Sequence, residues 1–89
     1  VAKTIYDGFK NMGLNPQTYK ISQAPYEFFE TKAGELVTKN GTHTAVKVGD
    51  RIYDAFTGPA GMLEADYLKM FVFRKLPDIT VVSTPPGGP

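Results

Sequence analysis

The single histidine of the chain, His43, is separated from an aspartate, Asp54, by a Gly49-Asp50 pair. Alternating runs at 42–48 and 51–56 flank that pair. Glycine–aspartate in this setting predicts a hairpin with a two-residue turn, because glycine allows the positive φ that such turns require. The hairpin would bring the imidazole and the carboxylate to one face of a sheet. A carboxylate beside an imidazole fixes its tautomer and raises its basicity, so the pair is a candidate general base.

The register of this hairpin follows from the length of its turn. His43 and Asp54 become diagonal neighbours, roughly 5–7 Å apart at Cβ, which is within hydrogen-bond reach for these side chains. The cross-strand pairs that we expect, from the tip outward, are Val48 with Arg51, Lys47 with Ile52, Ala45 with Asp54, and His43 with Phe56.

Three uses of His43 are compatible with these residues. It could be the general base for a nucleophile, and the hydroxyl nearest in register is Thr38, if Asn40-Gly41 forms a second hairpin. It could act in phosphodiester transfer on RNA, with Lys47 or Arg51 at the phosphate. It could also form a purely structural hydrogen bond with its carboxylate in a non-catalytic binding module.

Neither a metal nor a cofactor is predicted. One histidine and one neighbouring aspartate are too few ligands for a metal site, and the other acidic residues are scattered along the chain. The glycines at 34, 41, 49, 58 and 61 lie in evident turns and not in a phosphate-binding loop.

The composition indicates one small globular domain. The chain has 89 residues, of which 42% are hydrophobic and 21% are charged, and this is enough for one modest core. A net charge of +1 argues against bulk electrostatic binding to nucleic acid. There is no cysteine, so the sequence offers neither a disulfide nor a thiol nucleophile. No apolar run approaches the roughly 20 residues that a membrane-spanning helix needs, so no membrane span is predicted.

The remaining elements must position the His43–Asp54 pair. Apolar residues at helical spacing predict the helices, and β-branched or alternating runs predict the strands. The order favours an α+β domain with an N-terminal helix packed on an antiparallel sheet. The predicted elements are helices over about 1–12 and 62–71, and strands at 18–22, 35–39, 42–48, 51–56 and 79–82.

Two stretches need separate comment. The Asn40-Gly41 turn would join the strands on either side of it, so that 35–56 becomes a three-stranded meander with His43 near the end of its middle strand. The aromatic stretch 25–31 fits neither period, and its rings either cap the core or line a substrate cleft.

The chain opens inside an amphipathic pattern without a cap, which we interpret as the C-terminal piece of a longer protein. We expect a single domain over 1–83 and a flexible tail over 84–89.

Several motifs together resemble a known family. From the first helix through Leu68, the chain is similar to the papain-like toxin domains at the C-termini of bacterial polymorphic toxins. The motifs that carry this resemblance are Ala2-Lys3-x-Ile5-Tyr6-x-Gly8, Gly13-Leu14-Asn15-Pro16, Ile21-Ser22, Asn40-Gly41-Thr42-His43-Thr44-Ala45-Val46-Lys47-Val48-Gly49, Ile52-Tyr53-Asp54-Ala55-Phe56-Thr57-Gly58 and Tyr67-Leu68.

The resemblance implies a papain-like core and a thiol hydrolase that acts on amide bonds, as a peptidase or a deamidase. It assigns His43 as the base and Asp54 as the residue that orients it. The nucleophilic cysteine of the family lies at the start of the first helix, which corresponds to a position at or just before Val1. A helix N-terminus and a nearby imidazolium both lower the pKa of a thiol. We therefore expect the first helix to pack on the His43 face of the sheet.

The resemblance also implies a biological setting. The chain would be the effector domain of a secreted bacterial protein that acts in a target cell, with a protein substrate and a cognate immunity protein that blocks its cleft. The alternatives remain a small toxin ribonuclease that uses His43 with Lys47 or Arg51, and a non-catalytic binding module.

Overall fold

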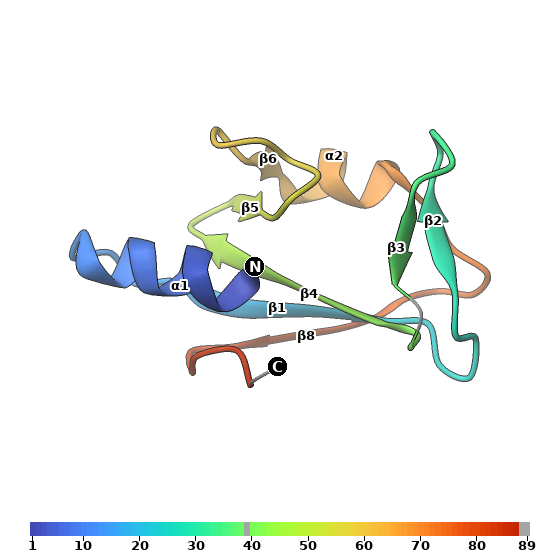
Figure 1. The fold of residues 1–89 in the computed structure, drawn as a ribbon, viewed down its shortest axis with the longest axis horizontal. Coiled ribbons are helices and arrows are strands. Elements are labelled where there is room, and N and C mark those ends of the chain that lie inside the picture. The colour runs from blue at the N-terminus through green and yellow to red at the C-terminus, as the bar shows by residue number, and fades with distance from the viewer. Residues whose placement is uncertain (39, 88–89) are drawn as a thin grey trace.

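The computed structural model describes residues 1–38 and 40–87 of the chain, and it has the α+β architecture that the sequence predicts (Figure 1). An N-terminal helix precedes two antiparallel sheets, and a short second helix lies between their strands in the sequence. The elements are α1 (Ala2–Asn11), β1 (Gln17–Ser22), β2 (Phe29–Thr31), β3 (Leu36–Thr38), β4 (Thr42–Val48), β5 (Arg51–Tyr53), β6 (Met62–Leu63), α2 (Glu64–Lys69), β7 (Phe71–Val72) and β8 (Asp78–Val82).

The larger sheet has β4 at its centre. Its five strands follow the order β6-β5-β4-β1-β8, and every neighbouring pair is antiparallel. The predicted Gly49-Asp50 hairpin is confirmed, because Val48 pairs with Arg51 in β5 and the turn glycine has a φ of 62°. On its other side β4 pairs with β1, where His43 lies opposite Ile21. His43 is thus the second residue of the central strand.

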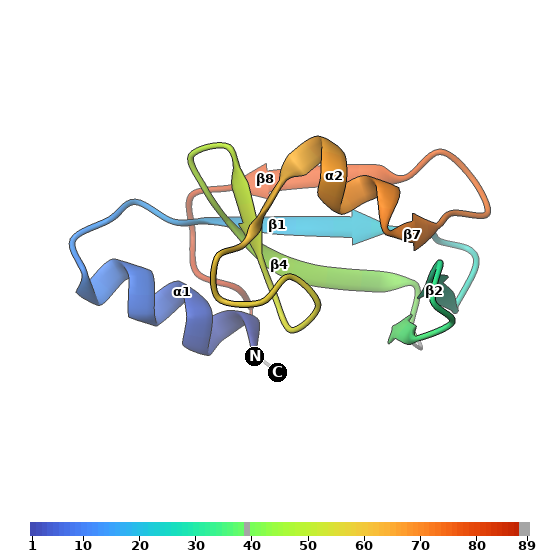
Figure 2. The same cartoon turned by 90° about the horizontal axis from the view of Figure 1, so that it is seen from above.

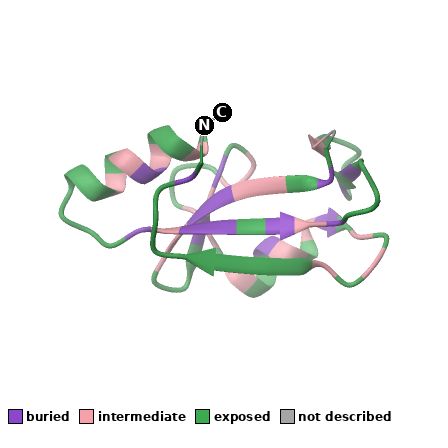
Figure 3. Cartoon of the chain, turned by 90° about the horizontal axis from the view of Figure 1, so that it is seen from below, coloured by how far each residue is buried: buried purple, intermediate pink, exposed green. Residues whose placement is uncertain are grey.

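The two helices cover opposite faces of this sheet. Ala45 and Ile52 belong to the core with Tyr67 of α2, so α2 lies on their face. Their strand neighbours point the other way, and one of these, Tyr53, packs against Phe9 of α1 with ring centroids 4.6 Å apart. In Figure 2, α2 lies in front of the strands, whereas in Figure 3, seen from below, it lies behind them.

The position of α1 corrects one expectation. His43 shares the face of Ala45, two residues along the same strand, and that face belongs to α2. The prediction that the first helix packs on the His43 face is therefore wrong. Hydrophobic periodicity shows which stripe of a helix is buried, but it does not show which side of a sheet receives that stripe.

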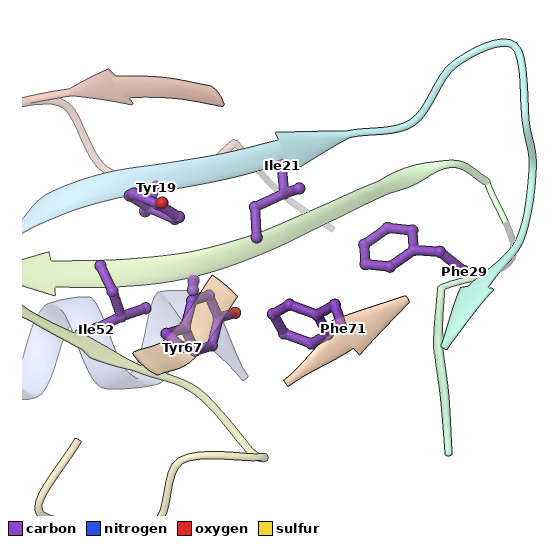
Figure 4. Packing of buried hydrophobic residues seen from close by; sticks show 7 residues of the cluster. Tyr19, Ile21, Phe29, Ile52, Tyr67 and Phe71 are labelled. Carbon is purple, nitrogen blue, oxygen red and sulfur yellow. The ribbon is translucent and has the colours of Figure 1, made fainter. Parts of the chain in front are cut away.

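The core lies between the larger sheet and α2 and continues toward the smaller sheet (Figure 4). Phe71 links the two parts, because its ring lies 4.9 Å from Tyr67 and 5.8 Å from Phe29. Within the aromatic stretch 25–31, Phe29 is a core residue, whereas Tyr26 and Phe28 stay about half exposed. The buried members of this cluster are Tyr19, Ile21, Phe29, Ala45, Ile52, Tyr67 and Phe71.

The predicted 35–56 meander is wrong in its first strand. In the described part of the chain, β3 pairs with β2 in the smaller sheet, whose order is β3-β2-β7, and not with β4. Gly41 explains the difference, because its backbone bonds to the 23–27 segment: its N–H donates to Glu27 (2.7 Å) and its carbonyl accepts from Gln23 (2.7 Å). These bonds continue the β1–β4 pairing past Thr42, so Asn40-Gly41 joins two sheets. Lys39, the end of the predicted 35–39 strand, lies outside the described residues.

Two predicted elements are shorter than expected. The 51–56 strand ends at Tyr53, because the Asp54 side chain bonds to backbone N–H groups just after it and turns the chain. The Ala45–Asp54 and His43–Phe56 pairs therefore do not form as ladder pairs. The 62–71 helix is reduced to α2 because its two ends pair as β6 and β7. None of the helices in the described ranges is long and apolar enough to cross a membrane.

The end of the chain returns toward its beginning (Figures 1 and 2). The Thr18 hydroxyl donates to the carbonyl of Thr84 over 2.5 Å, and the Tyr6 hydroxyl donates to the carbonyl of Ser83 over 3.5 Å. Pro86 is buried. Of the predicted 84–89 tail, residues 88–89 lie outside the described part.

Candidate functional site around His43 and Asp54

The structure brings the two predicted site residues into direct contact. His43 Nε2 lies 2.8 Å from Asp54 Oδ2. His43 projects from the start of β4, and Asp54 is the first residue after β5, so the hairpin between them sets their separation. The His43 side chain keeps 15% of its surface exposed and the Asp54 side chain only 3%. The pair is thus nearly dry on the carboxylate side and partly open on the imidazole side.

Asp54 is held by four donors. Its Oδ1 accepts the backbone N–H groups of Phe56 (2.7 Å) and Thr57 (3.1 Å), which is the local turn that ends the strand. Its Oδ2 accepts from His43 and also from the hydroxyl of Tyr67, which reaches it from α2. An ionised carboxylate offers about four acceptor positions, so all of them are filled. We call His43, Asp54 and Tyr67 the His43 cluster.

These contacts determine the protonation of the cluster. Burial raises the pKa of Asp54, but the hydrogen bonds from His43, from Tyr67 and from the backbone outweigh burial and hold that pKa below its usual range. Burial and the nearby Asp54 charge raise the pKa of Tyr67. At neutral pH, Asp54 is therefore a carboxylate and accepts only, while Tyr67 keeps its proton and donates. Nε2 of His43 must then carry a hydrogen, and in the neutral ring Nδ1 holds the free lone pair.

The second ring nitrogen of His43, Nδ1, is not fully buried. Among the described residues, every buried side-chain nitrogen or oxygen has a hydrogen-bond partner. Nδ1 of His43 has no hydrogen-bond partner among those residues, so it cannot be one of the fully buried atoms. The rings of Phe56 and Phe71 flank the imidazole, with centroids 5.9 and 6.4 Å from it. Two aromatic rings and a fixed carboxylate thus hold the imidazole, and Nδ1 has no hydrogen-bond partner among the described residues.

The other candidates from the sequence have different partners and form no hydrogen bond with His43 in the described part of the chain. Thr38 pairs with Phe29 and not with His43, and its hydroxyl donates to the carbonyl of Thr42 over 2.9 Å. Lys47 is four residues along β4, or ~13 Å at the usual strand rise, and it bonds to Glu64 over 3.1 Å. Arg51 is exposed at the hairpin tip.

Sequence reasoning missed the third member of the His43 cluster. Tyr67 fits the apolar stripe of a helix, and helical spacing treats its ring as a core residue, which it is. The available signal was its hydroxyl, because a buried tyrosine normally needs a hydrogen-bond partner. That signal shows that a partner exists but not which residue it is.

No family model, curated protein or solved structure matches this chain. Within the described ranges, no three histidine, aspartate or glutamate side chains gather at one point where a metal ion could bind. A functional site is therefore inferred from the geometry of the His43 cluster alone.

Proposed function

We propose that this chain is the effector domain of a bacterial toxin, a papain-like thiol hydrolase that cleaves amide bonds. In this proposal His43 is the general base and Asp54 orients it. The observation that supports it most is the bond between Nε2 and a fully occupied carboxylate, which leaves Nδ1 as the unprotonated nitrogen of the neutral ring.

The chemistry requires a thiol, and we propose that a cysteine ahead of Val1 in the natural protein supplies it. His43 Nδ1 would take the thiol proton, and the thiolate would attack the amide carbonyl carbon. The imidazolium would return that proton to the leaving nitrogen as the C–N bond breaks, leaving a thioester. Water, deprotonated by the same Nδ1, would then hydrolyse the thioester and regenerate the thiol. Asp54 stabilises the imidazolium in both halves of the reaction.

The direction of α1 supports a nucleophile from upstream. The helix begins near the middle of the larger sheet and runs away from the end where β4 starts (Figures 1 and 2). The helix thus starts nearer than it finishes to the end of the sheet where β4 begins, and residues ahead of Val1 would join the chain at that nearer end. Because α1 covers the opposite face, this segment would have to pass the edge of β4 near Thr42. The described β4–β5 ladder covers only Val46–Val48, which leaves that edge without a strand partner from β5.

The ribonuclease alternative has less support from the geometry. A phosphate-binding cation should lie beside the base, but Lys47 is bonded to Glu64 and Arg51 is at the hairpin tip. The binding-module alternative predicts no activity at all. Cleavage of total RNA that requires His43 but no upstream cysteine would favour the ribonuclease.

The proposed activity can be tested with the natural protein, including the residues that precede Val1. A thiol-reactive active-site probe should label one cysteine ahead of Val1, and His43→Ala should slow labelling and abolish amide hydrolysis. Lys47→Met is the matched control on the same strand and should leave both unchanged. A natural protein without a reactive cysteine in this segment, or labelling that is indifferent to His43, would end the proposal.

The toxin proposal includes partners and a location. A protein would be the substrate, a cognate immunity protein would cover the His43 cluster, and the chain would act in a target cell after secretion. An immunity protein that binds over Nδ1 should protect His43 from imidazole-modifying reagents. Unchanged modification of His43 in a stable complex would place that partner elsewhere.

A further inference from the structure

Tyr67 reaches the candidate site from a separate element. It lies on α2, is fully buried, and its ring packs nearly perpendicular to those of Tyr19 and Phe71. A hydroxyl in such a position cannot be satisfied by bulk water, so its partner must be a protein group. That partner is Oδ2 of Asp54, the same oxygen that accepts from His43.

Sharing one oxygen couples the hydroxyl to the imidazole. Each oxygen of Asp54 accepts from two donors, and rotation of the carboxylate would weaken bonds on both sides at once. Without the Tyr67 hydroxyl, Oδ2 would keep one donor and a buried, unfilled acceptor position. The carboxylate would then be held from the turn side only, and the His43 ring would lose part of the support that fixes its plane.

The chain contains a matched comparison. Tyr19 of β1 is also fully buried, and its hydroxyl also donates to a carboxylate, Glu64 Oε2, over 2.8 Å. Glu64 has a basic partner on β4 as well, since Lys47 donates to its other oxygen. We call Lys47, Glu64 and Tyr19 the Lys47 cluster. Each tyrosine thus donates to a carboxylate that also has a basic partner. Only the carboxylate bound by Tyr67, that of Asp54, contacts the histidine.

We propose that Tyr67 is a positioning residue of the candidate site: its hydroxyl completes the donor set of Asp54 and thereby holds the His43 ring in one orientation, with Nε2 bonded and Nδ1 free. The catalytic meaning of this inference rests on the proposed function. The effect of the Tyr67 hydroxyl on the His43 ring through Asp54, which we call the relay, does not rest on it, because it concerns only contacts within the described chain.

The relay can be measured by NMR as the solvent exchange of the Nε2–H proton of His43. Tyr67→Phe should accelerate this exchange about tenfold, since losing one hydrogen bond of about 1.4 kcal/mol increases the open population by that factor. Tyr19→Phe removes the hydroxyl of a second fully buried tyrosine in the same core and should change the exchange rate less than about twofold. Equal rates in the unmodified chain and a folded Tyr67→Phe variant would overturn the proposal.

A second measurement needs no variant and applies if Tyr67→Phe fails to fold. In partly deuterated water, deuterium on the Tyr67 hydroxyl should shift the Nε2–H resonance of His43, because the two hydrogen bonds share one acceptor. A single unshifted Nε2–H resonance would show that the hydroxyl does not act on the imidazole.

The effect of Tyr67 on catalysis can be measured separately. If the natural protein hydrolyses amides, Tyr67→Phe should lower kcat about tenfold with KM unchanged, whereas Tyr19→Phe should leave both unchanged. A loss shared equally by the two variants would indicate general loosening of the core and contradict a positioning role. Absence of hydrolysis in the unmodified protein would instead refute the proposed function and leave the relay to the NMR result.

Discussion

The His43 cluster and the Lys47 cluster use the same kinds of side chain to different effect. Each contains a basic residue of β4, a carboxylate and a fully buried tyrosine. The side chain of Asp54 is 3% exposed and its carboxylate has four donors, whereas the side chain of Glu64 is 36% exposed and its carboxylate has two described donors. The buried carboxylate of Asp54, with all its acceptor positions filled, can hold the His43 ring in one orientation. The partly exposed carboxylate of Glu64 connects the start of α2 to the sheet.

The comparison also shows why burial alone does not make a site. Burial raises the pKa of Asp54, and only its hydrogen bonds keep the group ionised. For Glu64, the hydrogen bond from Tyr19 is the largest influence and lowers its pKa, while burial matters less. A buried carboxylate stays charged only where the fold supplies enough donors, and such a carboxylate can fix the tautomer of a histidine.

The largest expected difference between the clusters is in stability. Asp54→Ala should lower the free energy of unfolding by about 3–5 kcal/mol, because it leaves the hydroxyl of Tyr67 and two backbone N–H groups without their acceptor in a dry site. Glu64→Ala should cost about 1 kcal/mol, because water can replace a partly exposed carboxylate. Urea unfolding of both variants measures the difference. Equal losses would mean that the clusters do not differ in the way we describe.

Removal of the two hydroxyls should give a smaller contrast. Tyr67→Phe should cost about 1.5 kcal/mol, as expected for a hydrogen bond to a buried charge, and Tyr19→Phe about 0.5–1 kcal/mol. Both variants keep the ring, so packing of the core is preserved. Thermal unfolding with a common reference temperature checks the ranking, and a larger loss for Tyr19→Phe would reverse our assignment.

Acid unfolding should sharpen the same comparison. The folded-state pKa of Asp54 is depressed, so its contribution is present above the unfolded value of about 3.9 and is lost as the pH falls through the folded value. Asp54→Asn should therefore flatten the acid side of the stability profile. Glu64→Gln should flatten it less, since solvent screens a partly exposed carboxylate. The slope of unfolding free energy against pH, measured below pH 5, tests this order. A steeper acid limb in Asp54→Asn than in the unmodified chain would refute it.

The smallest effect is expected at Lys47. Its ion pair with Glu64 is partly exposed, with side-chain exposures of 22% and 36%, and such pairs contribute about 0.5 kcal/mol. Lys47→Met should lower the free energy of unfolding by no more than that amount, and added salt should reduce the difference, because salt screens a partly exposed ion pair. A loss above about 2 kcal/mol would show that the Lys47 cluster is more tightly coupled than its exposure indicates.

The sequence predicted the parts of the fold that local chemistry decides. The Gly49-Asp50 hairpin formed in the expected register, because a two-residue turn fixes the pairing of the strands that it joins. Asn40-Gly41 carries an equally strong turn signal, but the backbone of Gly41 pairs with the 23–27 segment instead. That competition is between distant segments, so no local pattern could reveal it. The face of the sheet on which α1 packs could not be predicted for the same reason.

The candidate site divides in the same way. The contact between His43 and Asp54 could be predicted because one hairpin carries both residues. The contribution of Tyr67 could not, because it depends on where α2 packs, and helical spacing records only that its ring is buried. The Asp54 turn that ends β5 was also missed, since its side-chain bonds to Phe56 and Thr57 interrupt an otherwise regular alternation.

The central claim is that the His43 cluster leaves neutral His43 with a protonated Nε2 and an unprotonated Nδ1. The ¹⁵N spectrum of the imidazole in the unmodified chain, recorded where the ring is neutral, measures this most directly. We predict one tautomer, with Nε2 at the position of a protonated ring nitrogen and Nδ1 at that of an unprotonated one. A ring protonated mainly on Nδ1, or an even mixture of the two tautomers, would contradict the account.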